Sequence, residues 1–417
     1  MAHEGLSELI GSATHTVRSR SAPRVWFAVR YRLTAWWARV LVVFVVSRVV
    51  TTAILLWFAS RQETNAWTGA HPGYLDFAKL WDGHWYFIIA AAGYPADLPV
   101  TDDGHVGESA WAFMPAYPML VRLLMFATGL DFRVLAVFVS LAFALGTALL
   151  FYRLMNLVLP QGTALFAVVL YCFAPLSPIL QVSYAESMHA FFLTLALYLL
   201  LKRDYWMLLP VVVVMSLTRP SGLAFALAMG LHVVHRWMTR DRDPLPRREL
   251  VASVIVGAVS VVSGFAWLLI AAVATGSLSA YTDTELAWRA PYIGYRELVP
   301  LTPWVLGADF WLPGGLGVVL LILLVGVFVA FMFSPWVRRL GVDIRFWVAG
   351  YVLYLLAVFF PQSSTFRLLL PIFPLWGAVA QPKSWVYRLV VVLLCVAGQA
   401  GWIYIAWWVD GYDWTPP

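Results

Sequence analysis

The sequence predicts an all-α membrane protein that crosses the bilayer about eleven times. Of its 417 residues, 62% are hydrophobic and 12% are charged, and the mean hydropathy is +0.78. Apolar runs of about 20 residues recur along the chain, each long enough to cross about 30 Å of hydrocarbon as a helix. In lipid, backbone N–H and C=O groups must form hydrogen bonds within their own segment. These apolar runs are therefore expected to be helices. A soluble domain is excluded.

The predicted spans follow a polar, basic segment at residues 1–35, which does not resemble a cleavable signal. The fifth and sixth spans are separated only by TRPSG and could form one broken hairpin, and the tenth is short. We expect residues 1–417 to form a single integral-membrane domain. The span centres are Phe44, Phe143, Val169, Thr194, Val213, Leu227, Val261, Leu323, Leu355, Trp376 and Val396.

Basic residues predict the orientation of these spans. With an N-terminus in the cytoplasm, four basic clusters all fall on the cytoplasmic side. Two long loops, at residues 61–130 and 275–311, then face the extracytoplasmic side of the plasma membrane, with Asp82 and Trp288 outside and Arg242 inside. The clusters are Arg18, Arg20, Arg24, Arg30, Arg32 and Arg39; Arg236, Arg240, Arg242, Arg247 and Arg248; Arg338, Arg339 and Arg345; and Lys383 with Arg388. The net charge of +6 lies mostly in such loops and does not indicate nucleic-acid binding.

The stretch KLWDGHWYFIIAAAGYP, from Lys79 to Pro95, lies in the first long loop. Apolar residues at three- and four-residue spacing predict an amphipathic helix over 76–92 that lies along the outer interface and ends at Gly93. Asp82 lies near its start. The pattern alone leaves two interpretations open: a solvated carboxylate favoured by the helix dipole, or a general base at the water–lipid boundary. The predicted apolar face is Phe77, Trp81, Trp85, Ile88 and Ala92.

A second segment, over 109–126, contains AFMPAYPMLVRLL and is expected to bend at Pro115 and Pro118. This segment and WDGHWYFIIAAAGYP together resemble the PIG-V mannosyltransferase family and its bacterial members. Further matches are SYAESMHAFFLTLALYLL from Ser183, SLTRPSG from Ser216 and STFRLLLPIFPLWGA from Ser364, so the resemblance covers most of the chain. The chain departs from the family at Met114, where a second Phe is usual, and at Ser221, where Asn is frequent.

The resemblance implies a GT-C glycosyltransferase. Such an enzyme takes a sugar, here mannose, from a polyprenyl-phosphate carrier at the extracytoplasmic face. The family's catalytic acid maps onto Asp82, which we expect to act as the general base of an inverting transfer. The expected acceptor is a glycolipid, such as a phosphatidylinositol mannoside, or a glycan built on one.

Two arginines are candidates to bind the donor phosphate. Arg367 and Arg219 lie at predicted outer ends of spans, against the positive-inside trend, and each could equally be a structural, ion-paired arginine. Glu186 is expected to pair with Arg219 or to position the sugar. The remaining substrate-binding candidates are His84, Tyr86, Tyr117, His189 and Gln362, although a lone histidine is more often structural.

No histidine or cysteine has metal-ligand spacing, so we expect no cofactor, although Asp283 and Glu285 leave a divalent cation open. Cys172 and Cys395 are expected to be buried thiols, and Arg48 to bond to neighbouring helices. The alternative function is a lipid or sugar transporter or flippase, which needs ionisable residues deep in several spans. A non-catalytic partner subunit is a further alternative. The candidates cluster at the outer face, which favours interfacial chemistry.

Overall fold

The computed structural model describes residues 35–296 and 299–409. Its regular secondary structure there is helical, apart from an isolated bridge between Val100 and Val106. The predicted basic segment lies outside the described residues except for Ala35, and so do the arginines assigned to it, apart from Arg39.

Each predicted span centre falls on a helical segment, which confirms the all-α, polytopic membrane class. The short tenth segment combines the 3₁₀-helix η3 with α20. The segments are α3 (Trp36–Ala59), α7 (Phe132–Met155), α8 (Gln161–Phe173), α9 (Glu186–Lys202), α10 (Tyr205–Thr218), α11 (Gly222–Met238), α12 (Arg247–Thr275), α16 (Leu316–Met332), α18 (Val342–Val358), η3 (Leu370–Leu375) with α20 (Trp376–Val379), and α21 (Trp385–Trp402).

Within the described part of the chain, 4 helices are long and apolar enough to cross a membrane on their own. They are α3, α7, α12 and the continuous helix formed by α21 and the π-helical turn η4 (Ile403–Trp407). The tenth predicted span is short, as the sequence indicated. Pro371 and Pro374 leave the segment 370–375 as a 3₁₀-helix, and η3 with α20 reaches roughly 20 Å at about 2 Å per residue.

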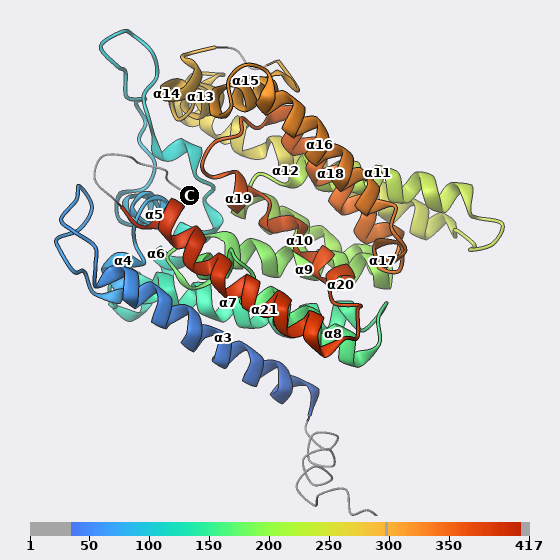
Figure 1. The fold of residues 1–417 in the computed structure, drawn as a ribbon. Coiled ribbons are helices and arrows are strands. Elements are labelled where there is room, and N and C mark those ends of the chain that lie inside the picture. Colours follow the sequence, from blue (N-terminus) through green and yellow to red (C-terminus); the bar gives the residue numbers. More distant parts are fainter. Residues whose placement is uncertain (1–34, 297–298, 410–417) are drawn as a thin grey trace, which may run out of the picture.

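The helices lie side by side, and their connections gather at two ends of the bundle (Figure 1). We call one the aromatic end. It holds the segments 60–131 and 276–315 with the short helices α4 (Tyr74–Phe77), α5 (Asp82–Ala92), α6 (Ala116–Thr128), α13 (Ala280–Ala287), α14 (Ala290–Ile293) and α15 (Thr302–Trp311). The other, the basic end, holds the connections 203–204, 239–246, 333–341 and 380–384, with α17 (Pro335–Arg338).

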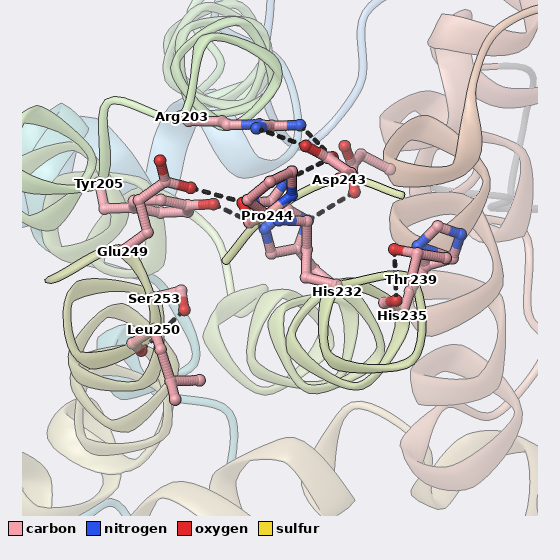
Figure 2. Close-up of polar contacts among 12 residues, drawn as sticks. Arg203, Tyr205, His232, His235, Thr239, Asp243, Pro244, Glu249, Leu250 and Ser253 are labelled. Atoms are coloured by element: carbon pink, nitrogen blue, oxygen red, sulfur yellow. Dashed lines mark hydrogen bonds and ion pairs between the residues drawn. The ribbon is translucent and has the colours of Figure 1, made fainter. Parts of the chain in front are cut away.

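Ion pairs join the connections at the basic end (Figure 2). Asp243 pairs with both Arg203 and Arg236, and Nη2 of Arg236 lies 2.7 Å from Oε2 of Glu249. Elsewhere at this end, Nη1 of Arg339 donates to the side-chain oxygen of Gln381 at 3.2 Å. Three of the predicted basic loops therefore lie at the same end, as the orientation prediction requires.

The segment that carries Asp82 differs from its prediction. Instead of one helix there are two, α4 and α5, with a break over 78–81. Trp81, which precedes α5, has φ +58° and ψ −124°, a conformation outside the helical region that keeps the two helices separate. The break changes the helical register, so the buried face of α5 is Gly83, Tyr86, Ile89 and Ala90 rather than the predicted one. This face packs against the rest of the protein, where the ring of Tyr86 lies edge-on to Phe113 and Tyr117. Gly93, with φ +86°, ends α5 as predicted.

The orientation of the bundle in the membrane can be tested by cysteine labelling. Asp103 and Arg242 are exposed and lie at opposite ends, whereas the native Cys172 and Cys395 are buried and should react little. We expect an impermeant maleimide to label Asp103→Cys in intact cells and Arg242→Cys only after the membrane is opened. The reverse pattern, or labelling of both from outside, would contradict the orientation predicted from the basic loops.

Candidate functional site

Asp82 is the first residue of α5, and local contacts fix its position. The indole of Trp81, the residue before Asp82, donates to the carbonyl oxygen of Trp407 at 3.0 Å. The backbone N–H of Asp82 donates to the hydroxyl of Tyr184 at 3.0 Å. The side chain of Asp82 is 14% exposed and its carboxylate contacts Arg367. The interpretation of Asp82 as a solvated carboxylate is therefore wrong.

Arg219 reaches the site because α10 must end there. Pro220 follows it and disfavours helical backbone at Arg219, which is extended (φ −149°, ψ 150°). The next helix can begin at once because Gly222 packs against Gly264 of α12, where a Cβ would lie 2.7 Å from the Gly264 Cα. Nη2 of Arg219 lies 3.4 Å from Oε1 of Glu186, the first residue of α9. The predicted pairing of Glu186 with Arg219 is confirmed.

Arg367 joins the two carboxylates. It lies on the single-turn helix α19 (Thr365–Leu368), and its Nη1 contacts Oδ2 of Asp82. Its Nε is 3.6 Å from Oε1 of Glu186, and its guanidinium lies 5.5 Å from the ring centroid of Tyr184. Asp82, Arg367, Glu186 and Arg219 thus form a continuous chain of opposite charges, which we call the charged quartet. Its formal charges cancel.

The quartet is buried and incompletely hydrogen-bonded. Its side chains are between 4 and 17% exposed. Among the described residues, neither carboxylate oxygen of Glu186 nor Nε of Arg367 has a hydrogen-bond partner. Removing charges from water costs several kcal/mol per ion, and unsatisfied buried polar atoms are uncommon in proteins. A buried cluster that retains hydrogen-bonding capacity is therefore a candidate ligand site.

Two tyrosines line the quartet. Tyr86 is buried on α5 and packs edge-on against Tyr184, with ring centroids 6.2 Å apart. Burial raises the pKa of Tyr86 above the usual tyrosine value, so its phenol stays protonated near neutral pH. Sequence analysis did not select Tyr184. Its place in SYAES, two residues before Glu186, was the signal that could have found it.

Three other residues predicted to bind substrate, Tyr117, His189 and His84, bond to or pack against residues outside the charged quartet. The hydroxyl of Tyr117 donates to the carbonyl oxygen of Ala136 at 2.9 Å, which ties α6 to α7. Nε2 of His189 lies 2.9 Å from Oγ of Ser221, which is two residues after Arg219 in the chain. His84 packs edge-on against the ring of Trp67 at 5.1 Å, and burial together with the charge of Lys79 lowers its pKa. Tyr117 and His189 therefore both make hydrogen bonds within the protein.

Gln362 precedes Arg367 by five residues, and its amide nitrogen donates to Oγ of Ser364 at 3.1 Å. Its side-chain oxygen is buried without a partner among the described residues, so it could accept a hydrogen bond from a ligand.

No group of three or more His, Cys, Asp or Glu side chains is placed to hold a metal ion in the described part of the chain. Glu285 on α13 pairs instead with Arg289 at 3.3 Å. Both cysteines are free and buried, as predicted. Arg48 donates to the carbonyl oxygens of Cys172 at 2.6 Å and Ser177 at 3.1 Å, which confirms that it bonds to neighbouring segments.

Comparisons with known proteins give a distant structural likeness. No family model matches the chain, and no curated protein matches it. A solved structure of the oligosaccharyltransferase of Archaeoglobus fulgidus, tethered with an acceptor peptide, aligns with a TM-score of 0.44 and 13% identity. The alignment covers 88% of this chain and 54% of that chain, so this protein spans about half the length of the structure it matches. At this level of similarity the likeness does not bear on substrates or residue roles.

Proposed function

We propose that this protein is a membrane glycosyltransferase of the GT-C type that transfers a sugar from a polyprenyl-phosphate carrier to a glycolipid hydroxyl. The observation that carries the proposal is the charged quartet. Its four members come from four separate segments of the chain and meet in a buried site at the aromatic end of the bundle. An apolar cluster would avoid the cost of burying four charges. Their retention supports a chemical role.

The residue types suit the two requirements of such a transfer. An acceptor hydroxyl attacks C1 of the sugar, and Asp82 takes its proton as the general base. The bond between C1 and the phosphate oxygen breaks, and its electron pair leaves with polyprenyl phosphate. Arg367 and Arg219 stabilise the charge on that phosphate. Attack from the face opposite the phosphate inverts the anomeric centre.

The contact between Arg367 and Asp82 adds a condition to this mechanism. While the guanidinium occupies the carboxylate, Asp82 is not free to accept a proton. The donor phosphate competes with Asp82 for Arg367, and its binding releases the carboxylate towards the acceptor. Glu186 lies within 3.6 Å of both arginines and holds them near each other despite their like charges. Donor binding therefore precedes deprotonation of the acceptor.

Two groups are placed to position the sugar. Tyr86 presents a protonated phenol beside the quartet, and Gln362 has an unpaired carbonyl oxygen near Arg367 along the chain. Sugar hydroxyls both donate and accept hydrogen bonds, so a phenol and an amide are suitable partners. The choice of mannose as the sugar and of a phosphatidylinositol mannoside as the acceptor follows from the family resemblance.

An assay of transfer tests the proposal. Purified protein is incubated with polyprenyl-phosphate-mannose and with phosphatidylinositol mannoside, and the product is followed by mass spectrometry. We expect one hexose to be added to the acceptor, and at least about a hundredfold less of this product with Asp82→Asn. Donors carrying another hexose or a pentose, run in parallel, test the choice of mannose. Absence of product with every donor, together with movement of the lipid across vesicle membranes, would favour the transporter alternative.

A further inference from the structure

A cavity of about 390 Å³ lies at the basic end of the bundle, and the mechanism above does not use it. Its walls come from the residues after α7, the end of α9 and the residues that lead into α18. Glu186 of the quartet begins α9 and Lys202, which ends α9, lines the cavity, so the two sites lie roughly 24 Å apart at 1.5 Å per residue. The volume is within the usual range of small-molecule sites, about 300–1,000 Å³.

Two opposite charges line this cavity without meeting. Lys202 contributes an ammonium group from the end of α9, and Asp343 contributes a carboxylate from the first turn of α18. Their charged atoms are more than 4.0 Å apart, because the two residues form no ion pair. Among the described residues, the ammonium group of Lys202 has no hydrogen-bond or ion-pair partner. The space between the two charges therefore suits a ligand that carries both an anion and a cation.

Asp343 is held in place from the protein side of the cavity. Its Oδ1 lies 2.7 Å from Nδ1 of His232, and Nε2 of His232 lies 2.9 Å from the hydroxyl of Tyr205 (Figure 2). The side chain of His232 is 4% exposed, whereas that of Asp343 is 19% exposed. Oδ2 of Asp343 has no partner in the part of the chain that the structure describes. One oxygen is thus fixed, and the other can accept a hydrogen bond from a ligand.

The remaining side chains that line the cavity are apolar. Leu157 is 39% exposed and Lys202 is exposed as well, so the cavity opens on the protein surface. The helix α7 is long and apolar enough to cross the membrane, and it ends two residues before Leu157. The opening therefore lies where a span ends, at the depth of lipid headgroups. The apolar lining residues are Leu157, Val158, Leu201, Leu340 and Val342.

We propose that this cavity binds a phospholipid whose headgroup carries both a phosphate and a primary ammonium group, as in phosphatidylethanolamine. Lys202 donates to the phosphate, and the ammonium group of the lipid donates to Oδ2 of Asp343. The leucine and valine side chains contact the glycerol and the first methylene groups of the acyl chains. The bound lipid joins the end of α9 to the start of α18. This inference does not depend on sugar transfer.

Other membrane lipids match the two charges less well. The quaternary ammonium group of phosphatidylcholine has no N–H to donate, so it cannot hydrogen-bond to Asp343. Phosphatidylglycerol has a phosphate for Lys202 but no cation, so it would leave the carboxylate of Asp343 unpaired beside a second negative charge. The choice among these three headgroups therefore tests the assignment of both side chains.

Three variants separate the two contacts. Lys202→Gln removes the phosphate partner, and because Lys202 is exposed and unpaired among the described residues, this variant should fold normally. Lys383→Gln is the matched control, since Lys383 is also exposed at the basic end and does not line the cavity. Asp343→Asn keeps an oxygen that can accept from His232 but removes the charge that selects an ammonium group.

Lipid binding is measured by native mass spectrometry of the purified protein. The three lipids, with identical acyl chains, are supplied in equal amounts. We expect phosphatidylethanolamine to be retained about tenfold more than either other lipid, the lower end of what a hydrogen bond to a charged group contributes. Lys202→Gln should lower its retention about tenfold, and Lys383→Gln should not change it. Asp343→Asn should lose the preference over phosphatidylcholine.

Several outcomes of this measurement would overturn the proposal. Equal retention of the three lipids would show that the cavity does not select a headgroup. A preference for phosphatidylglycerol would indicate a site for acidic lipids. The same loss in both lysine variants would indicate a general attraction to the basic end rather than a bond from Lys202.

Thermal unfolding in lipid nanodiscs provides a second measurement. A ligand that binds only the folded state raises the midpoint of unfolding. The midpoint should be higher with phosphatidylethanolamine than with phosphatidylcholine, and this difference should disappear in Lys202→Gln but persist in Lys383→Gln. Absence of any difference in the unmodified protein would contradict the proposal. Protection by soluble O-phosphoethanolamine without retention of the lipid would assign the cavity to a soluble ligand and would also overturn it.

Discussion

Asp82→Asn should lower the rate of sugar transfer at least about a hundredfold, the lower end of what general-base catalysis contributes. Asparagine keeps the size of the side chain but cannot accept the acceptor's proton. Binding of the donor should survive, because Arg367 and Arg219 are unchanged and Arg367 no longer has Asp82 as a competing partner. The rate is measured with saturating donor and acceptor, and donor binding is measured separately with undecaprenyl phosphate.

The stability of this variant must be measured beside its activity. Loss of one partner of a buried ion pair costs about 3–5 kcal/mol when the other charge is left uncompensated. Here the cost should be smaller, because Asp82 is 14% exposed and Glu186 remains 3.6 Å from Nε of Arg367.

The double variant Asp82→Asn/Arg367→Gln is the matched control. It removes both charges of the pair and leaves the pair of Glu186 and Arg219 intact. Recovery of thermal stability without recovery of transfer would assign Asp82 a chemical role. If Asp82→Asn keeps most of its activity, the base lies elsewhere. Glu186 is then the next residue to test, ahead of Asp76, which already pairs with Arg133 at 2.7 Å.

Arg367→Ala should lower transfer roughly ten- to a hundredfold, the worth of one charge-assisted bond to phosphate. The main effect should be a weaker use of the polyprenyl-phosphate sugar, because the lost guanidinium acts on the phosphate. Arg367→Lys should recover part of the loss, because lysine restores the charge but not the planar fork of donors. Steady-state kinetics with the donor as the varied substrate measure both effects.

Arg133→Ala is the control for Arg367→Ala. Arg133 also contacts two carboxylates, Asp76 and Asp131, and lies at the same end of the bundle, but its side chain is 40% exposed. Exposed pairs of this kind contribute about 0–1 kcal/mol, so this variant should keep its stability and activity. Full activity of Arg367→Ala would show that Arg367 is a structural arginine and would leave the phosphate to Arg219.

The sequence by itself determined the class of the protein and most of its helices. Span centres such as Phe44, Phe143 and Val261 could be placed because a membrane helix is specified by its own apolar run. Arg219 and Arg367 could also be selected, since ionisable residues are rare at such positions in spans, whereas Asp82 was selected through the family resemblance. Arg48 and the pairing of Glu186 with Arg219 followed from the same reasoning.

The tertiary structure decided how these residues meet. Arg367 and Asp82 are 285 positions apart, and no local pattern encodes their contact. The break before α5 is held by the bond from Trp81 to Trp407, so helical periodicity alone predicted one continuous helix over 76–92. Tyr184 became a site residue through its bond to the backbone of Asp82.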